Sequence, residues 1–155
     1  MSKRLLSAAL ALALVGCSSD DKGPTPPSSV PVDEATELAL TLTELAPDGS
    51  LSFTLDNGAG LAVTGASDYS VTFLGYAGAY DTAFSMPWHT SDRFGCGQEV
   101  PDCVGTLEEL EPGVYHFSPD REPQLGDRVT SVKLSIRVHG ALASTPPNVM
   151  DAPQG

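Results

Sequence analysis

Two soft metal ligands and an indole ring lie close together near the middle of the sequence. Met86 and His89 flank Trp88, and thioether and imidazole groups are ligands that copper accepts. A protein metal site needs three or four ligands, and only these two clean candidates cluster. The competing arrangement has Trp88 filling a domain interior while His89 faces solvent. Copper binding through Met86 and His89 therefore stays an alternative hypothesis, and the sequence predicts no bound cofactor.

The start of the chain predicts a different chemistry, at Cys17. Lys3 and Arg4 precede an apolar run over residues 5–15, and a glycine stands directly before the cysteine. A charged start, a short apolar run and small residues at the end are the parts of a secretory signal peptide. With the cysteine, the stretch resembles a bacterial lipoprotein signal that ends in a lipobox. The resemblance implies that Cys17 is lipidated and that residues 1–16 are removed; an ordinary signal peptide with an incidental cysteine is the alternative.

Cys96 and Cys103 remain as one pair when Cys17 is assigned to the lipid. An exported chain lies in an oxidising compartment, where a disulfide is the default for two such thiols. Their separation of seven positions does not match the C-x2-C spacing of zinc sites. We therefore predict a structural disulfide that closes a short loop and stabilises the fold by roughly 2.5 kcal/mol.

Charge and motif content narrow the classes of function. Two of the eight basic residues lie in the predicted signal, which leaves six against twenty acidic residues. A surface so acidic argues against nucleic acid, whose phosphates require Lys and Arg. The sequence has no G-x-S-x-G motif and no D-x-[DN]-x-[DN]-G calcium loop. We expect a packed or edge position for His116 and solvent exposure for His139, so the prediction is a protein that is not an enzyme, with a hydrolase as a remote alternative.

Alternation of apolar and polar residues predicts the elements that must position these side chains. The clearest case is 132–139, where Val132, Leu134, Ile136 and Val138 should point inward and Lys133, Ser135, Arg137 and His139 outward. Predicted strands cover residues 38–43, 51–56, 61–63, 69–73, 106–110, 114–117 and 132–139. The sequence therefore predicts an all-β fold, either an immunoglobulin-like sandwich or a Greek-key split barrel, of about seven short strands.

The segment 75–105 interrupts this pattern. It holds the one tryptophan and both paired cysteines, and loops longer than about 12–15 residues in compact domains are usually functional or disordered. Its aromatic, sulfur and cationic side chains form the candidate binding loop: Met86, Trp88, His89, Arg93 and Phe94. Because aromatic and Arg side chains dominate binding hot spots, we predict a binding surface with Trp88 as its anchor. A buried Trp88 in the sandwich core is the alternative.

Four stretches in a fixed order carry a resemblance to a known family. They read ELALTL at 37–42, LSFTLDNG at 51–58, LAVTG at 61–65 and PGVYHF at 112–117. A lipobox and a polar spacer come first, and the long insert lies between the third and fourth stretches. This order resembles the N-terminal β-domain of outer-membrane decahaem c-type cytochromes of the OmcA/MtrC type, over about residues 38–138. The haem-binding part that follows in that family is missing here, so the resemblance implies a fold and a location but no electron transfer.

The sequence thus predicts four parts. They are a signal peptide at 1–16, the lipidated Cys17 with a flexible tether at 17–33, a β-sandwich domain at 34–141 and a disordered tail at 142–155. The predicted function is a non-catalytic outer-membrane lipoprotein, held to the membrane through its N-terminal lipid. Its domain would bind a protein partner in the cell envelope and could serve as an accessory to a multihaem cytochrome.

Overall fold

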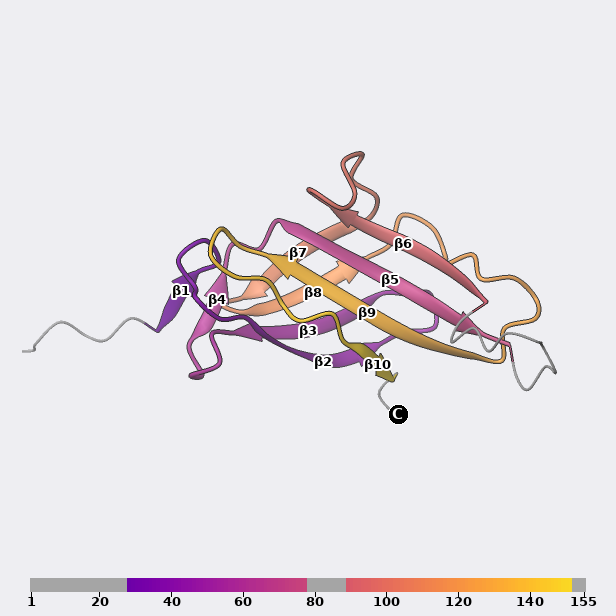
Figure 1. Cartoon of the computed structure of the whole chain (residues 1–155), viewed down its shortest axis with the longest axis horizontal. Coiled ribbons are helices and arrows are strands. Elements are labelled where there is room, and N and C mark those ends of the chain that lie inside the picture. Colours follow the sequence, from indigo (N-terminus) through magenta and orange to yellow (C-terminus); the bar gives the residue numbers. More distant parts are fainter. Residues whose placement is uncertain (1–27, 78–88, 152–155) are drawn as a thin grey trace, which may run out of the picture.

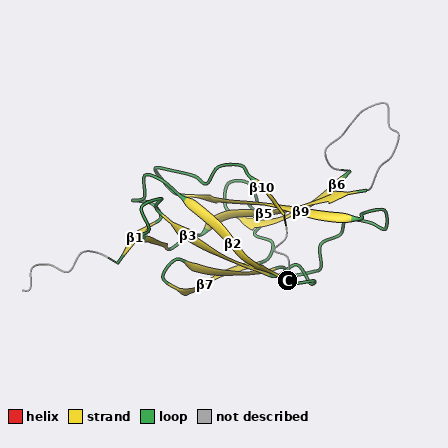
Figure 2. Cartoon of the chain, turned by 90° about the horizontal axis from the view of Figure 1, so that it is seen from below, coloured by secondary structure: helices red, strands yellow, loops and turns green. Residues whose placement is uncertain are grey.

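The computed structural model describes residues 28–77 and 89–151, and these residues form two stacked β-sheets (Figures 1 and 2). No helix occurs among the described residues, so the predicted all-β fold is confirmed. The strands are β1 (Ser29–Pro31), β2 (Ala39–Leu45), β3 (Leu51–Asp56), β4 (Ala62–Thr64), β5 (Asp68–Tyr76), β6 (Thr90–Cys96), β7 (Thr106–Glu111), β8 (Val114–Ser118), β9 (Ser131–His139) and β10 (Val149–Asp151).

The chain crosses between the two sheets three times. One sheet has the order β1-β4-β3-β8-β7, with β2 also paired to β3, and is called here the β3 sheet. The other has the order β10-β9-β5-β6 and is called the β5 sheet. Each sheet is completed only by strands that come late in the chain, β8 and β7 in the first and β9 and β10 in the second. This arrangement is a sandwich with one core between its two layers.

The core follows from strict alternation in the strands that face it. In β3, Leu51, Phe53 and Leu55 are at most 1% exposed, whereas the residues between them are half-buried. In β9, Leu134 and Ile136 are buried and their neighbours are not, which confirms the predicted inward set of the last strand. Aromatic rings from both sheets then fill the space between these rows. Phe53 stacks on Tyr115 within the β3 sheet at 5.3 Å between ring centroids, and Phe117 of this sheet packs edge-on against Tyr69 and Phe94 of the β5 sheet.

The predicted tail from residue 142 is wrong for the part that the structure describes. β10 pairs antiparallel with β9, and Thr145 is 2% exposed. The amide of Thr145 donates to the carbonyl of Val138 at 3.0 Å, and the amide of Val138 donates to Thr145 Oγ1 at 3.0 Å. The outer edge of β9 needs hydrogen-bond partners, and this stretch supplies them. Its two adjacent prolines resemble a linker in composition, which hid the pairing.

The fold also begins earlier than predicted. β1 lies inside the predicted tether, in parallel pairing with β4, and the amide of Val32 donates to the carbonyl of Thr64 at 2.8 Å. Val32 is 6% exposed and belongs to the core. Three residues of strand carry too weak an alternation to stand out beside the proline-rich run that precedes them.

The irregular insert is shorter than the sequence suggested. β5 continues to Tyr76 and β6 begins at Thr90, and these two strands pair over seven residues. β6 reads TSDRFGC, in which charge and glycine obscure the alternation. Its free edge is covered by the loop after β8, where Arg121 pairs with both carboxylate oxygens of Asp92 and the amide of Gln124 donates to Asp92 Oδ2 at 2.7 Å.

Candidate functional site

The structure separates the members of the predicted binding loop. Cys17, Met86 and Trp88 lie outside the described residues. Phe94 is fully buried in β6, with its ring 5.8 Å from that of Phe73 and 6.0 Å from that of Phe117. Its assignment to a binding surface is therefore wrong, because its position in the β6 alternation points it into the core. Arg93, the residue before it, points to the outer face with about half of its side chain exposed.

His89 lies directly before β6, at the end of the β5–β6 pair where β5 stops. Its amide donates to the carbonyl of Gly75 at 2.9 Å, and the residue lines a hollow together with Leu125, Arg128 and Val129. Gly75 has no room for a side chain and lets Val129 pack closely against β5, because a Cβ at Gly75 would lie 2.6 Å from Val129 Cγ2. Within the part of the chain that the structure describes, no three His, Cys, Asp or Glu side chains converge as a metal site.

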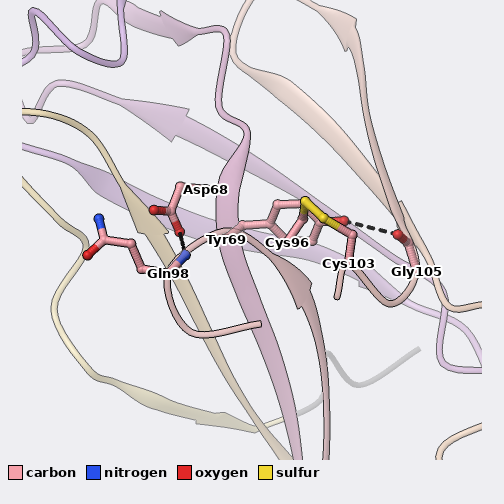
Figure 3. Close-up of a disulfide and its surroundings, with 6 residues drawn as sticks. All are labelled: Asp68, Tyr69, Cys96, Gln98, Cys103 and Gly105. Carbon is pink, nitrogen blue, oxygen red and sulfur yellow. Dashed lines mark hydrogen bonds between the residues drawn. A yellow bond between two sulfur atoms is a disulfide. The ribbon is translucent and has the colours of Figure 1, made fainter. Parts of the chain in front are cut away.

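The predicted disulfide between Cys96 and Cys103 is present, and it closes the loop 97–102 at the end of β6 (Figure 3). Directly before the loop, the backbones of Gly95 and Val104 exchange two hydrogen bonds of 2.8 and 2.7 Å. Gly95 must be glycine, since its φ is +145° and a Cβ would collide with the carbonyl oxygen of Tyr69. We call residues 97–102 the disulfide loop.

Contacts within the disulfide loop and directly after it fasten this part of the chain to β5. The amide of Gln98 donates to Asp68 Oδ1 at 3.2 Å, and Tyr69 Oη donates to the carbonyl of Gly105 at 3.3 Å (Figure 3). Cys103 has φ +48°, which is the left-handed region and costs an L-residue about 1–2 kcal/mol. The loop therefore holds its shape through the disulfide and these contacts against a backbone preference for another conformation.

The disulfide loop places one carboxylate on the outer face of the β5 sheet. Glu99 Oε2 accepts a hydrogen bond of 2.8 Å from Ser70 Oγ, and Glu99 Oε1 lies 2.8 Å from Arg137 Nη1. Arg93 Nη1 is 3.7 Å from Oε2, and His139 Nε2 is 3.3 Å from Oε1. Because Ser70 pairs with Arg137 across one edge of β5 and with Gly95 across the other, the register brings these groups together. We call these five residues the Glu99 cluster.

The electrostatics of the Glu99 cluster favour the ionised acid. Burial raises the pKa of Glu99, but the hydrogen bond from Ser70 and the charges of Arg137, Arg93 and His139 together outweigh that effect. The pKa of Glu99 is therefore held below its usual range, and the carboxylate is charged at neutral pH. Side-chain exposure is 23% for Glu99 and 33% for Arg137, so solvent screens the pair only in part.

His139 joins the Glu99 cluster to the turn after β9. Its side chain is 15% exposed, which corrects the predicted solvent position. Nδ1 of the ring lies 2.9 Å from Ser144 Oγ, so serine, histidine and glutamate form a continuous chain. Hydrolysis by such a chain also needs N–H groups for the oxyanion, and the nearby amides of Gly140 and Thr145 already donate to Ala143 and Val138. The arrangement therefore orients His139 and Glu99 and gives no support to a nucleophilic serine.

The sequence contains part of the signal for this cluster. Alternation in the last strand predicts the outward positions of Arg137 and His139, which the structure confirms. Glu99 is a charged residue between Cys96 and Cys103, which the sequence predicts to pair. A short loop closed by a disulfide holds such a residue near the surface of the sheet. What the sequence does not reveal is which strand the loop folds onto, because that depends on the β5–β6 and β5–β9 registers.

Comparisons of the chain with protein-family models, with curated proteins and with solved structures found no match. A search of the described residues for a helix long and apolar enough to cross a membrane also found none. Function is therefore inferred from the geometry of the sandwich and from the residues that it displays.

Proposed function

We propose that the protein is a non-catalytic binding module of the bacterial outer membrane, anchored through a lipid on Cys17. The sandwich would contact a protein partner in the cell envelope with the end where β5 stops and β6 starts. The signal-like N-terminus supports the anchor, and the disulfide agrees with an oxidising compartment.

The observation that carries this proposal is the position of two segments at opposite ends of the sandwich. β1, where the chain enters the fold from its N-terminal side, lies at one end, and the last residues of β5 and the start of β6 lie at the other (Figures 1 and 2). A domain held by its N-terminus presents its far end to the surroundings, so the segment that contains Trp88 starts and stops where a partner has access.

The far end also has a surface suited to contact. The hollow beside His89 is lined by the apolar side chains of Leu125 and Val129 and by the charged residues Asp127 and Arg128. Apolar surface surrounded by a few polar groups is the usual composition of a binding site. The two-sheet fold agrees with the fold that the resemblance to decahaem cytochrome β-domains implies, and a multihaem cytochrome is the partner class that this resemblance suggests.

Partner capture from outer-membrane extracts tests the proposal. The full lipidated chain should retain a specific partner, and Trp88→Ala and Arg128→Ala should each weaken retention at least tenfold, because aromatic and Arg side chains dominate binding hot spots. Leu110→Ala is the matched control, since Leu110 is an exposed apolar residue of β7 on the other sheet. Equal retention by all three variants would contradict a binding surface at the far end.

Copper titration tests the alternative. Stoichiometric copper binding that is lost in Met86→Leu and in His89→Gln would replace the protein-binding proposal with a metal-handling lipoprotein. Unchanged spectra on addition of copper would leave the binding module as the better account.

A further inference from the structure

We propose that Ser70, Arg93, Arg137 and His139 form a carboxylate-binding site that the protein's own Glu99 fills. The Cys96–Cys103 disulfide keeps the site filled, and its reduction makes the site available to a carboxylate ligand. This inference goes beyond the proposed function, because it concerns the outer face of the β5 sheet and holds whether or not Trp88 contacts a partner.

The first support is the convergence of donors on one point. Ser70 Oγ and Arg137 Nη1 each lie 2.8 Å from a different oxygen of the same carboxylate, with Arg93 and His139 within 3.7 Å. Ser70 is 1% exposed although it lies on the outer face of β5. A hydroxyl and two guanidinium groups around one carboxylate are the elements of an anion site, because charge-assisted hydrogen bonds are the strongest that side chains make.

The second support is hydrogen-bonding capacity that Glu99 leaves unused at Arg137. Among the described residues, Arg137 Nε is buried without a hydrogen-bond partner, and His139 Nε2 is buried with only its ion-pair contact of 3.3 Å to Glu99 Oε1. A buried donor without a partner is costly, so Arg137 Nε favours a ligand that can accept a hydrogen bond from it. A carboxylate that enters without the constraint of a loop backbone can approach Arg137 through Nε and Nη together, which is the bidentate geometry.

The third support is how Glu99 is held in place. The disulfide loop closes at the half-buried Cys96 and at the exposed Cys103, whose left-handed backbone is adopted only reluctantly by an L-residue. The contact of Gln98 with Asp68 is a single hydrogen bond at 3.2 Å. Once the disulfide is open, the hydrogen bonds that join residues 97–102 to β5 are this one and that of the Glu99 carboxylate with Ser70.

The opening step is a thiol–disulfide exchange with a dithiol reductant. A thiolate of the reductant attacks the exposed Cys103 sulfur, a mixed disulfide forms, and the Cys96 sulfur leaves as a thiolate and takes up a proton. The second thiol of the reductant then attacks the reductant sulfur that is bonded to Cys103. This step releases Cys103 as a thiolate, which also takes up a proton. The protein gains two electrons and two protons, and the reductant becomes a disulfide.

Acetate is the probe for the site. Melting temperatures of the full chain, purified in detergent, are measured in sodium acetate and in sodium chloride at equal ionic strength. In Glu99→Ala, acetate should raise the melting temperature by a few degrees with a saturable dependence on concentration, because a ligand that binds only the folded state stabilises it. Oxidised wild type, whose site is filled, should respond equally to the two salts, and so should Glu99→Ala with Arg137→Ala.

The matched control is Glu108→Ala, which removes an exposed carboxylate of β7 on the other sheet. A response of Glu99→Ala no larger than that of Glu108→Ala would overturn the carboxylate site. Glu99→Ser repeats the comparison if the alanine variant does not fold.

Control of the carboxylate site by the disulfide is tested with Cys96→Ser/Cys103→Ser and with wild type in dithiothreitol. Both should acquire an acetate response that is weaker than that of Glu99→Ala, because Glu99 still competes for the site. A response in Glu99→Ala with none in either disulfide-free protein would overturn control by the disulfide.

Discussion

The two sheets of the sandwich share one core but differ on their outer faces. The strands of the β3 sheet contain no Lys or Arg, whereas the β5 sheet contains Arg93, Lys133 and Arg137. β7, at the edge of the first sheet, is exposed along most of its length, whereas β5 is buried on both faces over seven consecutive residues. Near Ser70 the β5 sheet is covered by the disulfide loop, which supplies the carboxylate that pairs with Arg93 and Arg137.

The largest effect should separate two adjacent residues of β6 that face opposite sides. Phe94→Ala should lower the free energy of unfolding by about 3–5 kcal/mol, because it removes a fully buried ring from the core shared by the two sheets. Arg93→Ala, on the outer face, should cost no more than about 1 kcal/mol. Urea denaturation followed by circular dichroism measures both, and similar losses would mean that the register of β6 is wrong.

Opening the disulfide should have the next largest effect, and it should be confined to one sheet. We expect the free energy of unfolding to fall by about 2–3 kcal/mol in Cys96→Ala/Cys103→Ala. Amide hydrogen exchange should accelerate in β5 and β6 near Ser70, where the disulfide loop lies, and remain slow in β3. Acceleration of equal size in both sheets would contradict a local cover.

Removal of the Glu99 charge should have a smaller effect that depends on pH. The folded-state pKa of Glu99 is lowered, so its contribution to stability is present above the unfolded pKa and is lost as pH falls through the folded pKa. Glu99→Gln should therefore lose up to about 1 kcal/mol at pH 7 and become equal to wild type in strong acid. Glu108→Gln is the control on the β3 sheet, and thermal unfolding between pH 7 and pH 2 gives the comparison.

The smallest effects should come from charged side chains whose ends reach solvent. Lys133, paired with the exposed Asp151 at 3.0 Å, and Glu111 of β7 should each tolerate alanine with little change in the free energy of unfolding. A larger loss at Lys133 than at Glu111 would show that the ion pair with β10 adds to the stability of the β5 sheet.

The sequence predicted the strands with one exposed face better than the segments that cover or extend the sheets. Alternation identified the inward residues of β3 and β9 because each of these strands has one core face and one wetter face. β5 has no such alternation, since Ser70 and Thr72 are buried beneath other parts of the chain. The pairing of β10 and the burial of Thr145 could not be predicted either, because an edge strand of three residues depends on β9 for its hydrogen bonds and has little pattern of its own.

The candidate site shows the same limit. The disulfide and the outward face of β9 followed from residue types and spacing, and both are present. Phe94 was misplaced because a glycine and two charged residues in β6 hid its strand, so its ring was assigned to a loop. The meeting of Glu99 with Ser70 and Arg137 joins three segments that are far apart in the chain, and only the registers of β5 with β6 and with β9 bring them together.

The direct test of the account is the titration of Glu99 itself. Carbon-13 NMR of the side-chain carboxyl gives its pKa in the oxidised protein and in the protein reduced with dithiothreitol. The account predicts a pKa below the usual glutamate range when the disulfide holds Glu99 against Ser70 and Arg137, and a rise towards the ordinary value after reduction. An ordinary pKa in the oxidised protein, or the same lowered pKa in both states, would contradict it.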